Sequence, residues 1–188
     1  MWFEDEGWLH LPWIKRVPSP NEDPRPLGTL VDTLVVHCIS LPERGRSTEY
    51  IEDLFLNRLD YNAHPSFPAL TGLHVSAHFL IDRDGAVTQF VSCDTRAWHA
   101  GVSAAMDRHH FNHFSIGVEL LGDVYTPFEV AQYDSLRKLT LELLKLYPLR
   151  YAMAHSEISP TRKNDPGPFF DWTDFRKSNT YELKIQAR

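Results

Sequence analysis

The sequence predicts a single-domain α/β protein built from short strands and helices. Three observations favour this class: apolar runs rich in β-branched residues, an Asp-Gly turn between two such runs, and one long amphipathic helical pattern. The 188 residues are enough for about one domain. A composition of 43% hydrophobic and 23% charged residues is typical of a globular chain.

Residues 1–28 are expected to form an extended arm. They are rich in proline, which fixes φ and removes a backbone donor, and they contain Trp2, Trp8 and Trp13. We expect these tryptophans to pack on the main domain, which we assign to residues 29–175. Residues 176–188 are polar and are expected to form a fraying C-terminal tail.

Three elements are predicted in the first half of the main domain. The apolar run at 34–39 indicates a buried strand. Ser47 or Thr48 can cap a following helix, whose residues Ile51, Leu54 and Phe55 share one helical face. Residues 77–81 and 86–91 then flank Asp84-Gly85, the signature of a β-hairpin.

The second half alternates strands with one long helix. Residues 114–121 form an apolar strand pattern interrupted by a carboxylate. The string TPFE at 126–129 matches a capping box with proline at the first helical position, so the helix is expected to begin there and to run to about Tyr147. Residues 151–155 indicate another short strand, followed by a rigid proline-rich loop at 159–171.

Composition and charge exclude several classes of protein. The formal net charge of −6 argues against nucleic acid or an anionic membrane as a partner, because both require a basic surface. No apolar stretch approaches the roughly 18 residues that span a bilayer, and the first residues are acidic, unlike a signal peptide. Cys38 and Cys93 form no disulfide framework. We therefore expect a cytoplasmic protein without membrane contact.

Two histidines that end predicted strands, His37 and His155, are candidate metal ligands together with Asp165. Two imidazoles and a carboxylate leave the fourth position of a tetrahedral Zn²⁺ open to water, as in catalytic zinc sites. Glu119, a carboxylate within an apolar strand, is a candidate general base. From spacing alone, ordinary roles as core or surface histidines and as a turn-capping aspartate are favoured over a metal site.

Six separated motifs change this balance, because they occur in the order found in bacterial N-acetylmuramoyl-L-alanine amidases of the AmpD type. The resemblance extends from about Gly7 to Phe175. A set of six ordered motifs is far more specific than any one of them. The motifs are VVHCISLP at 35–42, VSAH at 75–78, RDG at 83–85, RAWHAG at 96–101, NHFSIGVE at 112–119 and RKNDPG at 162–167.

The resemblance implies a mixed β-sheet flanked by helices, a fold shared with peptidoglycan-recognition proteins and phage amidases. It also implies one Zn²⁺ per chain and cleavage of the amide between the lactyl group of (anhydro)muramic acid and L-alanine, in the recycling of wall fragments. The implied roles are zinc ligation by His37, His155 and Asp165, acid and base catalysis by Glu119, oxyanion contact by Lys163, and a place beside the substrate groove for Trp98 and His99.

The chain departs from the family pattern at several positions. Cys38 stands where asparagine is common after the first zinc histidine. Because successive strand residues point to opposite faces, we expect Cys38 to pack in the core. The alternative is that its thiolate is a fourth ligand of the zinc ion. His74 and His110 replace common arginines, and with Arg108 they are candidates for binding the muropeptide substrate.

Two other interpretations of function stay open at this point. One is a binding module that keeps the peptidoglycan-recognition fold without hydrolysis, and the other is a histidine-rich protein with a purely structural metal. The complete set of His37, His155, Asp165 and Glu119 argues against the binding module. Glu119 and Lys163 have no obvious purpose beside a purely structural metal. The remaining histidines are not expected to bind metal: His74 and His78 are expected in a strand, and the His109-His110 pair in a solvated loop. The protein is expected to be a monomer.

Overall fold

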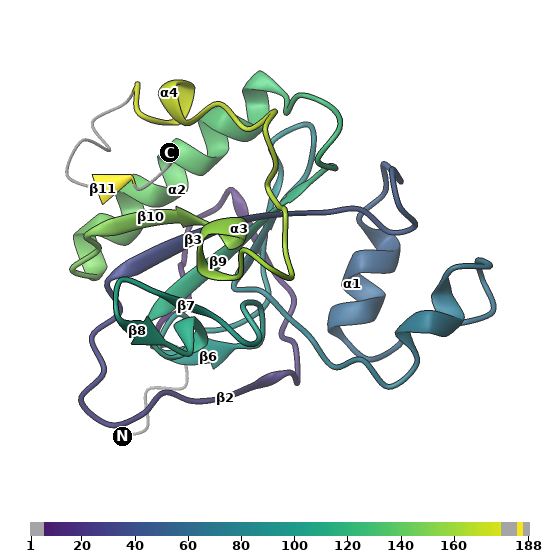
Figure 1. The fold of residues 1–188 in the computed structure, drawn as a ribbon, viewed down its shortest axis with the longest axis horizontal. Helices are drawn as coiled ribbons and strands as arrows, with labels where there is room; N and C mark the ends of the chain where they lie inside the picture. Colours follow the sequence, from purple (N-terminus) through teal and green to yellow (C-terminus); the bar gives the residue numbers. More distant parts are fainter. Residues whose placement is uncertain (1–5, 178–183, 186–188) are drawn as a thin grey trace.

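A seven-stranded mixed sheet forms the centre of the protein (Figure 1). The structure, a computed structural model, describes residues 6–177 and 184–185. Only β4 and β5 pair antiparallel; the other neighbours in this sheet are parallel. In spatial order the strands are β1 (Ile14–Arg16), β5 (Val87–Gln89), β4 (Phe79–Ile81), β9 (Ser115–Leu121), β3 (Thr33–Ile39), β10 (Tyr151–Ala154) and β11 (Lys184–Ile185).

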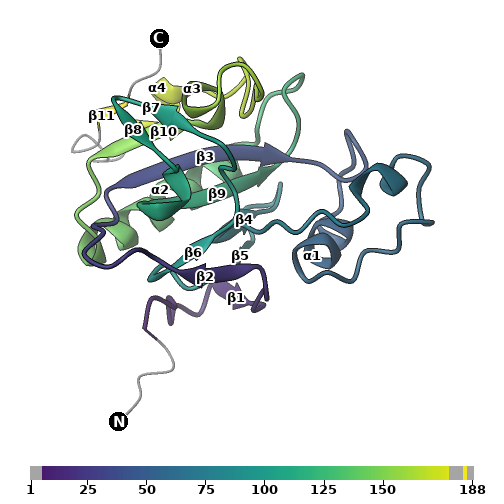
Figure 2. The same ribbon diagram turned by 60° about the horizontal axis from the view of Figure 1, so that its bottom comes forward.

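The helices lie around this sheet and two small ribbons complete the structure. Figure 1 shows α2 running behind the sheet, and both views place α1 beyond the carboxyl end of β3 (Figures 1 and 2). The helices are α1 (Glu49–Phe55), α2 (Val130–Leu146), α3 (His155–Ile158) and α4 (Trp172–Phe175), with 3-10 turns η1 (Phe67–Leu70) and η2 (Phe111–His113). The ribbons pair β2 (Glu22–Pro24) with β6 (Thr95–Ala97) and β7 (Ala104–Ala105) with β8 (Arg108–His109).

The two central strands are apolar because both of their faces are covered, as parallel strands require. Along β3, Leu34 and Val36 pack with Leu136 of α2, whereas Val35 points to the opposite face and packs with Met153. Strand β9 is buried at each of its seven residues. The mixed sheet with flanking helices confirms the predicted fold class, and the strands at 34–39 and 114–121 and the Asp-Gly hairpin lie where they were expected.

Two predicted boundaries are wrong by a few residues. The long helix begins at Val130 rather than next to Thr126. The Thr126 hydroxyl binds the Asp123 carboxylate in the preceding turn, and the Glu129 backbone is extended and donates its N–H to Gln132 Oε1, so the helix is capped three residues later. His155 does not end a strand; it is the first residue of α3.

The N-terminal arm contributes edge strands as well as packing. Strand β1 joins the main sheet and β2 pairs with β6. Trp13 packs against the main core cluster, with the Lys138 ammonium over its ring at 4.0 Å. The Trp8 ring lies under Arg16 of the same arm at 4.1 Å, and Trp2 lies outside the described residues. In the C-terminal tail, β11 adds a short parallel strand to β10, and the rest of 178–188 lies outside the described residues.

Within the described chain, no helix combines the length and the apolar character that crossing a membrane requires.

Arg25 attaches the arm to the body through a set of backbone carbonyls. Its guanidinium donates hydrogen bonds of 2.8–3.1 Å to backbone carbonyl oxygens near β9 and β6. Without Arg25, these partly buried oxygens would lack a hydrogen-bond donor. The planar guanidinium offers five donors, which one lysine ammonium cannot reproduce. The accepting carbonyls belong to Cys93, Asn112, His113 and Ser115.

Arg25→Lys is therefore expected to lower the free energy of unfolding by about 2 kcal/mol, because carbonyls bound by a charged donor lose their partners. Urea denaturation followed by circular dichroism measures the change. The matched control is Arg58→Lys, at an exposed residue 3.4 Å from Asp53, which is expected to change stability by less than about 0.5 kcal/mol. Equal effects of the two substitutions would show that the Arg25 contacts do not hold the arm.

Candidate metal centre

Parallel pairing brings the candidate residues to one edge of the sheet. His37 of β3 lies directly beside Glu119 of β9 in the strand register. Ala154 of β10 pairs with Val36, so the next residue, His155, arrives beside His37. The carboxyl ends of parallel strands are where open α/β sheets bind their ligands. Strand order thus places both histidines and the carboxylate at the position typical of an active site.

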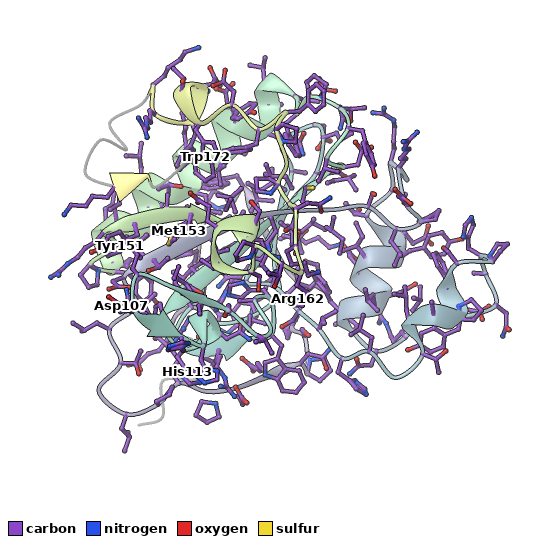
Figure 3. The ribbon with its side chains drawn as sticks, viewed as in Figure 1. Asp107, His113, Tyr151, Met153, Arg162 and Trp172 are labelled. Carbon is purple, nitrogen blue, oxygen red and sulfur yellow. The ribbon has the colours of Figure 1, made fainter. Side chains whose placement is uncertain are left out.

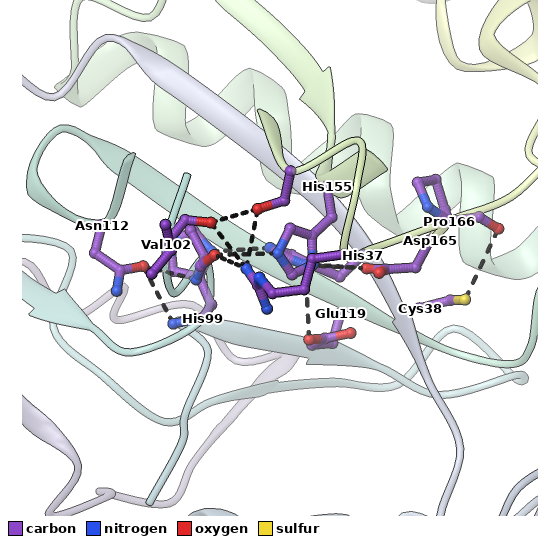
Figure 4. A network of polar contacts seen from close by, with 12 residues as sticks. His37, Cys38, His99, Val102, Asn112, Glu119, His155, Asp165 and Pro166 are labelled. Atoms are coloured by element: carbon purple, nitrogen blue, oxygen red, sulfur yellow. Dashed lines mark hydrogen bonds and ion pairs between the residues drawn. The ribbon is translucent and has the colours of Figure 1, made fainter. Parts of the chain in front are cut away.

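Three ligand atoms converge at this edge (Figure 4). The Nδ1 atoms of His37 and His155 lie 2.9 Å apart, and Asp165 Oδ2 lies 3.2 Å from the first and 3.1 Å from the second. All three residues are buried. Among the described residues, this is the one group of three or more histidine, cysteine or acidic side chains that is arranged to hold a metal ion.

The chemistry of these atoms fits a cation. His155 Nε2 lies 3.2 Å from the carbonyl oxygen of Ala100, which can only accept, so Nε2 carries the proton and Nδ1 presents its lone pair to the centre. Although burial raises the pKa of Asp165, the two histidines lower it well below its usual range whenever they carry a proton, so the carboxylate is the form that faces this group. Burial lowers the pKa of His37 to about 4. A carboxylate and neutral imidazoles are the ligand types that Zn²⁺ prefers.

Glu119 lies beside this group, and one of its two carboxylate oxygens has no partner in the described part of the chain. Its Oε1 is 3.9 Å from His37 Nδ1, and Oε2 is buried with no hydrogen-bond partner in the described part of the chain. Burial and the nearby Asp165 charge raise the pKa of Glu119 well above its usual value, while Lys163 lowers it. A buried carboxyl group with a raised pKa can both accept and donate a proton near neutral pH.

A cavity of about 400 Å³ borders Asp165, the one ligand among its lining residues. Lys163, Arg162 and Asp165 line it from the 159–171 loop, Cys38 from the end of β3, and Tyr125 from the loop before α2. A larger cavity of about 770 Å³ lies by α3 and α4. Its lining includes Met153 and Trp172, whereas Arg162 lies on the opposite side of α3 (Figure 3). Ser156 and Pro166, each next to a ligand, border this second cavity.

Comparison with known proteins gives the family. The profile of the N-acetylmuramoyl-L-alanine amidase family matches residues 27–168. The chain belongs to this family of amidases. It is 47% identical to the 1,6-anhydro-N-acetylmuramyl-L-alanine amidase AmpD of Citrobacter freundii over 92% of both chains, and 45% identical to AmpD of Escherichia coli K12 over 92% of this chain and 94% of that one.

Solved structures agree with the sequence comparison. The crystal structure of a selenomethionine derivative of AmpD superposes with a TM-score of 0.87, at 44% identity, over 96% of this chain and 98% of that one. A complex of E. coli AmiD with the substrate anhydro-N-acetylmuramic acid-L-Ala-D-gamma-Glu-L-Lys matches with a TM-score of 0.58 at 26% identity, over 82% of this chain and 60% of that one. Drosophila peptidoglycan recognition protein SA shares the fold at 17% identity and a TM-score of 0.59, covering 87% and 90% of the chains.

In this amidase, the neighbouring residues Trp98 and His99 differ in exposure. Trp98 is partly exposed, and hydrogen bonds from Arg96 and Trp98 lower the pKa of Asp23 in β2. His99, expected beside a substrate groove, instead has a buried ring behind His37, with its Nδ1 2.8 Å from His37 Nε2. The His99 side chain therefore contacts a candidate metal ligand, and its place beside a substrate groove stays a prediction.

The other three expected substrate contacts lie on loops and in β8. Arg108 is engaged in a bidentate ion pair with Asp32, just before β3, and its guanidinium lies over the Phe114 ring at 3.6 Å. Its charge is thus already paired, at the end of β3 away from His37. His74 is exposed and bonds to Asn57, and His110 is exposed before η2. A substrate role for these histidines stays a prediction.

Cys38 lies on the face of β3 opposite to His37. It packs partly against the cluster under α2, and its thiol points to the Pro166 carbonyl at 3.8 Å (Figure 4). Burial raises the pKa of this thiol. Strand alternation explains the position, as expected, although the sulfur also borders the small cavity. A neutral thiol turned away from the ligands is not arranged as a fourth metal ligand.

Sequence reasoning missed the residues that support His37 from behind. Ser115 lies 3.1 Å from His99 Nε2, and the Asn112 side chain accepts hydrogen bonds from the backbone N–H groups of His99 and Ala100. One signal was present in the sequence. Gly117 interrupts an otherwise apolar strand, and a glycine inside a strand often marks a close approach by another group.

Cys38→Ser is expected to keep one bound zinc ion per chain and to change the zinc dissociation constant by less than about threefold, because the thiol is not among the ligands. Metal content after gel filtration and competition with a chromophoric chelator measure both quantities. His155→Ser is the matched control that removes a ligand, and it is expected to lose the metal. Loss of zinc from a folded Cys38→Ser protein would make the thiolate a ligand.

Proposed function

We propose that this chain is a zinc-dependent amidase, with one ion held by His37, His155 and Asp165. The observation that carries the proposal is the convergence of two Nδ1 atoms and one carboxylate oxygen beside the unpartnered, buried Glu119. Three protein ligands leave a coordination position open, which is typical of catalytic rather than structural zinc. The family to which the chain belongs supports the same chemistry.

We infer that the substrate is a muropeptide carrying a 1,6-anhydro-N-acetylmuramic acid end. Two relatives at 45% and 47% identity are named for cleavage next to this sugar, and AmiD was solved with an anhydromuramyl peptide. The bond broken is the amide between the lactyl group and L-alanine. A role in recycling wall fragments in the cytoplasm, and action as a monomer, stay predictions from the sequence.

Glu119 is the proposed acid and base. Zinc bound at this site supplies a Lewis acid and lowers the pKa of water toward 7. The Glu119 carboxylate takes a proton from the attacking water and then delivers it to the nitrogen of the leaving L-alanine. Its burial suits a group that exchanges protons, since burial raises the pKa of Glu119 above the usual value of a carboxyl group.

Lys163 is the proposed cation for the developing oxyanion. It lines the small cavity together with Asp165, and its charge acts on Glu119 and His37. Arg162, the neighbouring cation, is less available, because its guanidinium donates to the carbonyls of Ala100 and Val102. A hydrogen-bonding cation directed at an oxyanion contributes mainly to turnover rather than to substrate binding.

Removal of the metal is expected to abolish hydrolysis of a 1,6-anhydromuropeptide, and one equivalent of Zn²⁺ is expected to restore it. The products, the anhydro sugar and the free peptide, are measured by mass spectrometry. His37→Ala is expected to lose both zinc and activity, and His64→Ala, at a partly exposed loop histidine, is expected to retain both. Full hydrolysis by the metal-free protein would contradict the proposal.

Glu119→Gln is expected to bind zinc normally and to lower kcat by about 10²–10⁴, because it removes the proton carrier and keeps the side-chain shape. Steady-state kinetics and metal analysis of the same preparation measure the two effects. Glu157→Gln is the control: this partly buried carboxylate caps α3 through the Ala154 N–H and has no role in the proposed chemistry. A near-normal kcat in Glu119→Gln would assign the proton transfer to another group.

A further inference from the structure

We propose that His99 is a positioning residue, oriented by Ser115, that holds His37 in the tautomer whose Nδ1 can bind the metal ion. The inference deepens the proposed function, because it rests on a metal ion at His37. It concerns a buried chain of hydrogen bonds from Ser115 through His99 to His37, and Figure 4 shows the two histidines. In each bond, the donor is determined by the bond before it.

The chain begins at Ser115. Its Oγ lies 2.6 Å from the carbonyl oxygen of Phe111, which can only accept, so the hydroxyl hydrogen is committed to that bond. The same Oγ lies 3.1 Å from His99 Nε2. With its hydrogen used, the hydroxyl must accept in this second contact, and His99 therefore carries its proton on Nε2.

The second link reaches the metal ligand. A neutral imidazole protonated on Nε2 has a lone pair on Nδ1, and His99 Nδ1 lies 2.8 Å from His37 Nε2. His37 must then be the donor, with its proton on Nε2. Its Nδ1 is left unprotonated and faces His155 Nδ1 and Asp165 Oδ2. A proton on Nδ1 of His37 would occupy the position that the metal requires.

The fold holds the His99 ring firmly in this place. The ring is buried and lies against β9 at Gly117, where a Cβ atom would come within 2.5 Å of His99 Cγ. Its plane meets that of His37 nearly edge to face, with centroids 4.9 Å apart. On the backbone, the N–H groups of His99 and Ala100 both donate to Asn112 Oδ1. Ring and backbone are therefore both oriented before any ligand binds.

The two histidine ligands differ in how their tautomers are set. His155 Nε2 faces the carbonyl of Ala100, an acceptor that no substitution removes. His37 depends on a side chain that could adopt either tautomer itself, and Ser115 decides which one. Partners behind a metal ligand commonly change metal affinity by about 10- to 100-fold. The dependence of His37 on a side chain makes this inference testable by substitution.

The first test compares two amides at position 99. Asparagine places its Oδ1 where the imidazole has Nδ1 and keeps an acceptor for His37, whereas glutamine reaches toward Ser115 and leaves that position without one. His99→Gln is expected to raise the zinc dissociation constant by about 10- to 100-fold, and His99→Asn by less than about threefold, in chelator competition. Circular dichroism and thermal melting verify that both fold, and His64→Gln serves as the control substitution. Equal zinc affinities of the two variants would overturn the proposal.

The second test needs no variant and no zinc. Nitrogen-15 spectra of the histidine rings in the metal-free wild-type protein, near pH 7.5, are expected to show His37 and His99 both protonated on Nε2. Protonation of either ring on Nδ1 instead would overturn the relay. Failure of the wild-type protein to bind zinc would refute the proposed function, and the ring spectra would still decide the tautomers, so the two failures are distinguishable.

Discussion

The parallel register of β3 with its two neighbours is the constraint on which the site depends. It sets His37 beside Glu119 and brings His155 alongside as β10 ends. A shift of one residue in either pairing would turn the side chains of that strand to the opposite face. The apolar residues of β3 and β9, packed between α2 and the opposite cluster, therefore hold the geometry of the proposed site as well as the core.

The same pairing gathers several hydrogen-bond acceptors in a buried place, and the groups behind them provide part of the hydrogen bonding that they need. Asp165, Glu119 and two neutral imidazoles are acceptors gathered in a buried place, which is unfavourable without a cation. Behind them the polar groups are matched: His37 to His99, and His155 to a backbone carbonyl. Among the buried side-chain nitrogen and oxygen atoms of the described structure, only Glu119 Oε2 is left without a partner. The unsatisfied polar atom therefore belongs to a residue beside the position where a metal ion and substrate are proposed to bind.

The distribution of cations explains how an acidic protein can act on an acidic muropeptide. Arg25 and Arg162 bind backbone carbonyls, and Arg108 is paired with Asp32, so these charges serve the fold. Lys163 differs, since it is exposed, lines the small cavity and acts on the proposed acid and base. One cation at the reacting group can thus be effective despite the net charge of −6.

The sequence by itself determined the fold class, the central strands, the hairpin and, through six ordered motifs, the family and the candidate residues His37, Glu119, His155, Lys163 and Asp165. Local sequence patterns could predict the strands and the hairpin, because strand alternation and turn conformation depend on residues that are close in the sequence. The tertiary structure alone decided that His99 lies behind His37 and that Arg108 is paired with Asp32. It also decided where the long helix begins. These outcomes depend on which groups, distant in the sequence, form each hydrogen bond. Residue spacing along the chain does not determine those partners.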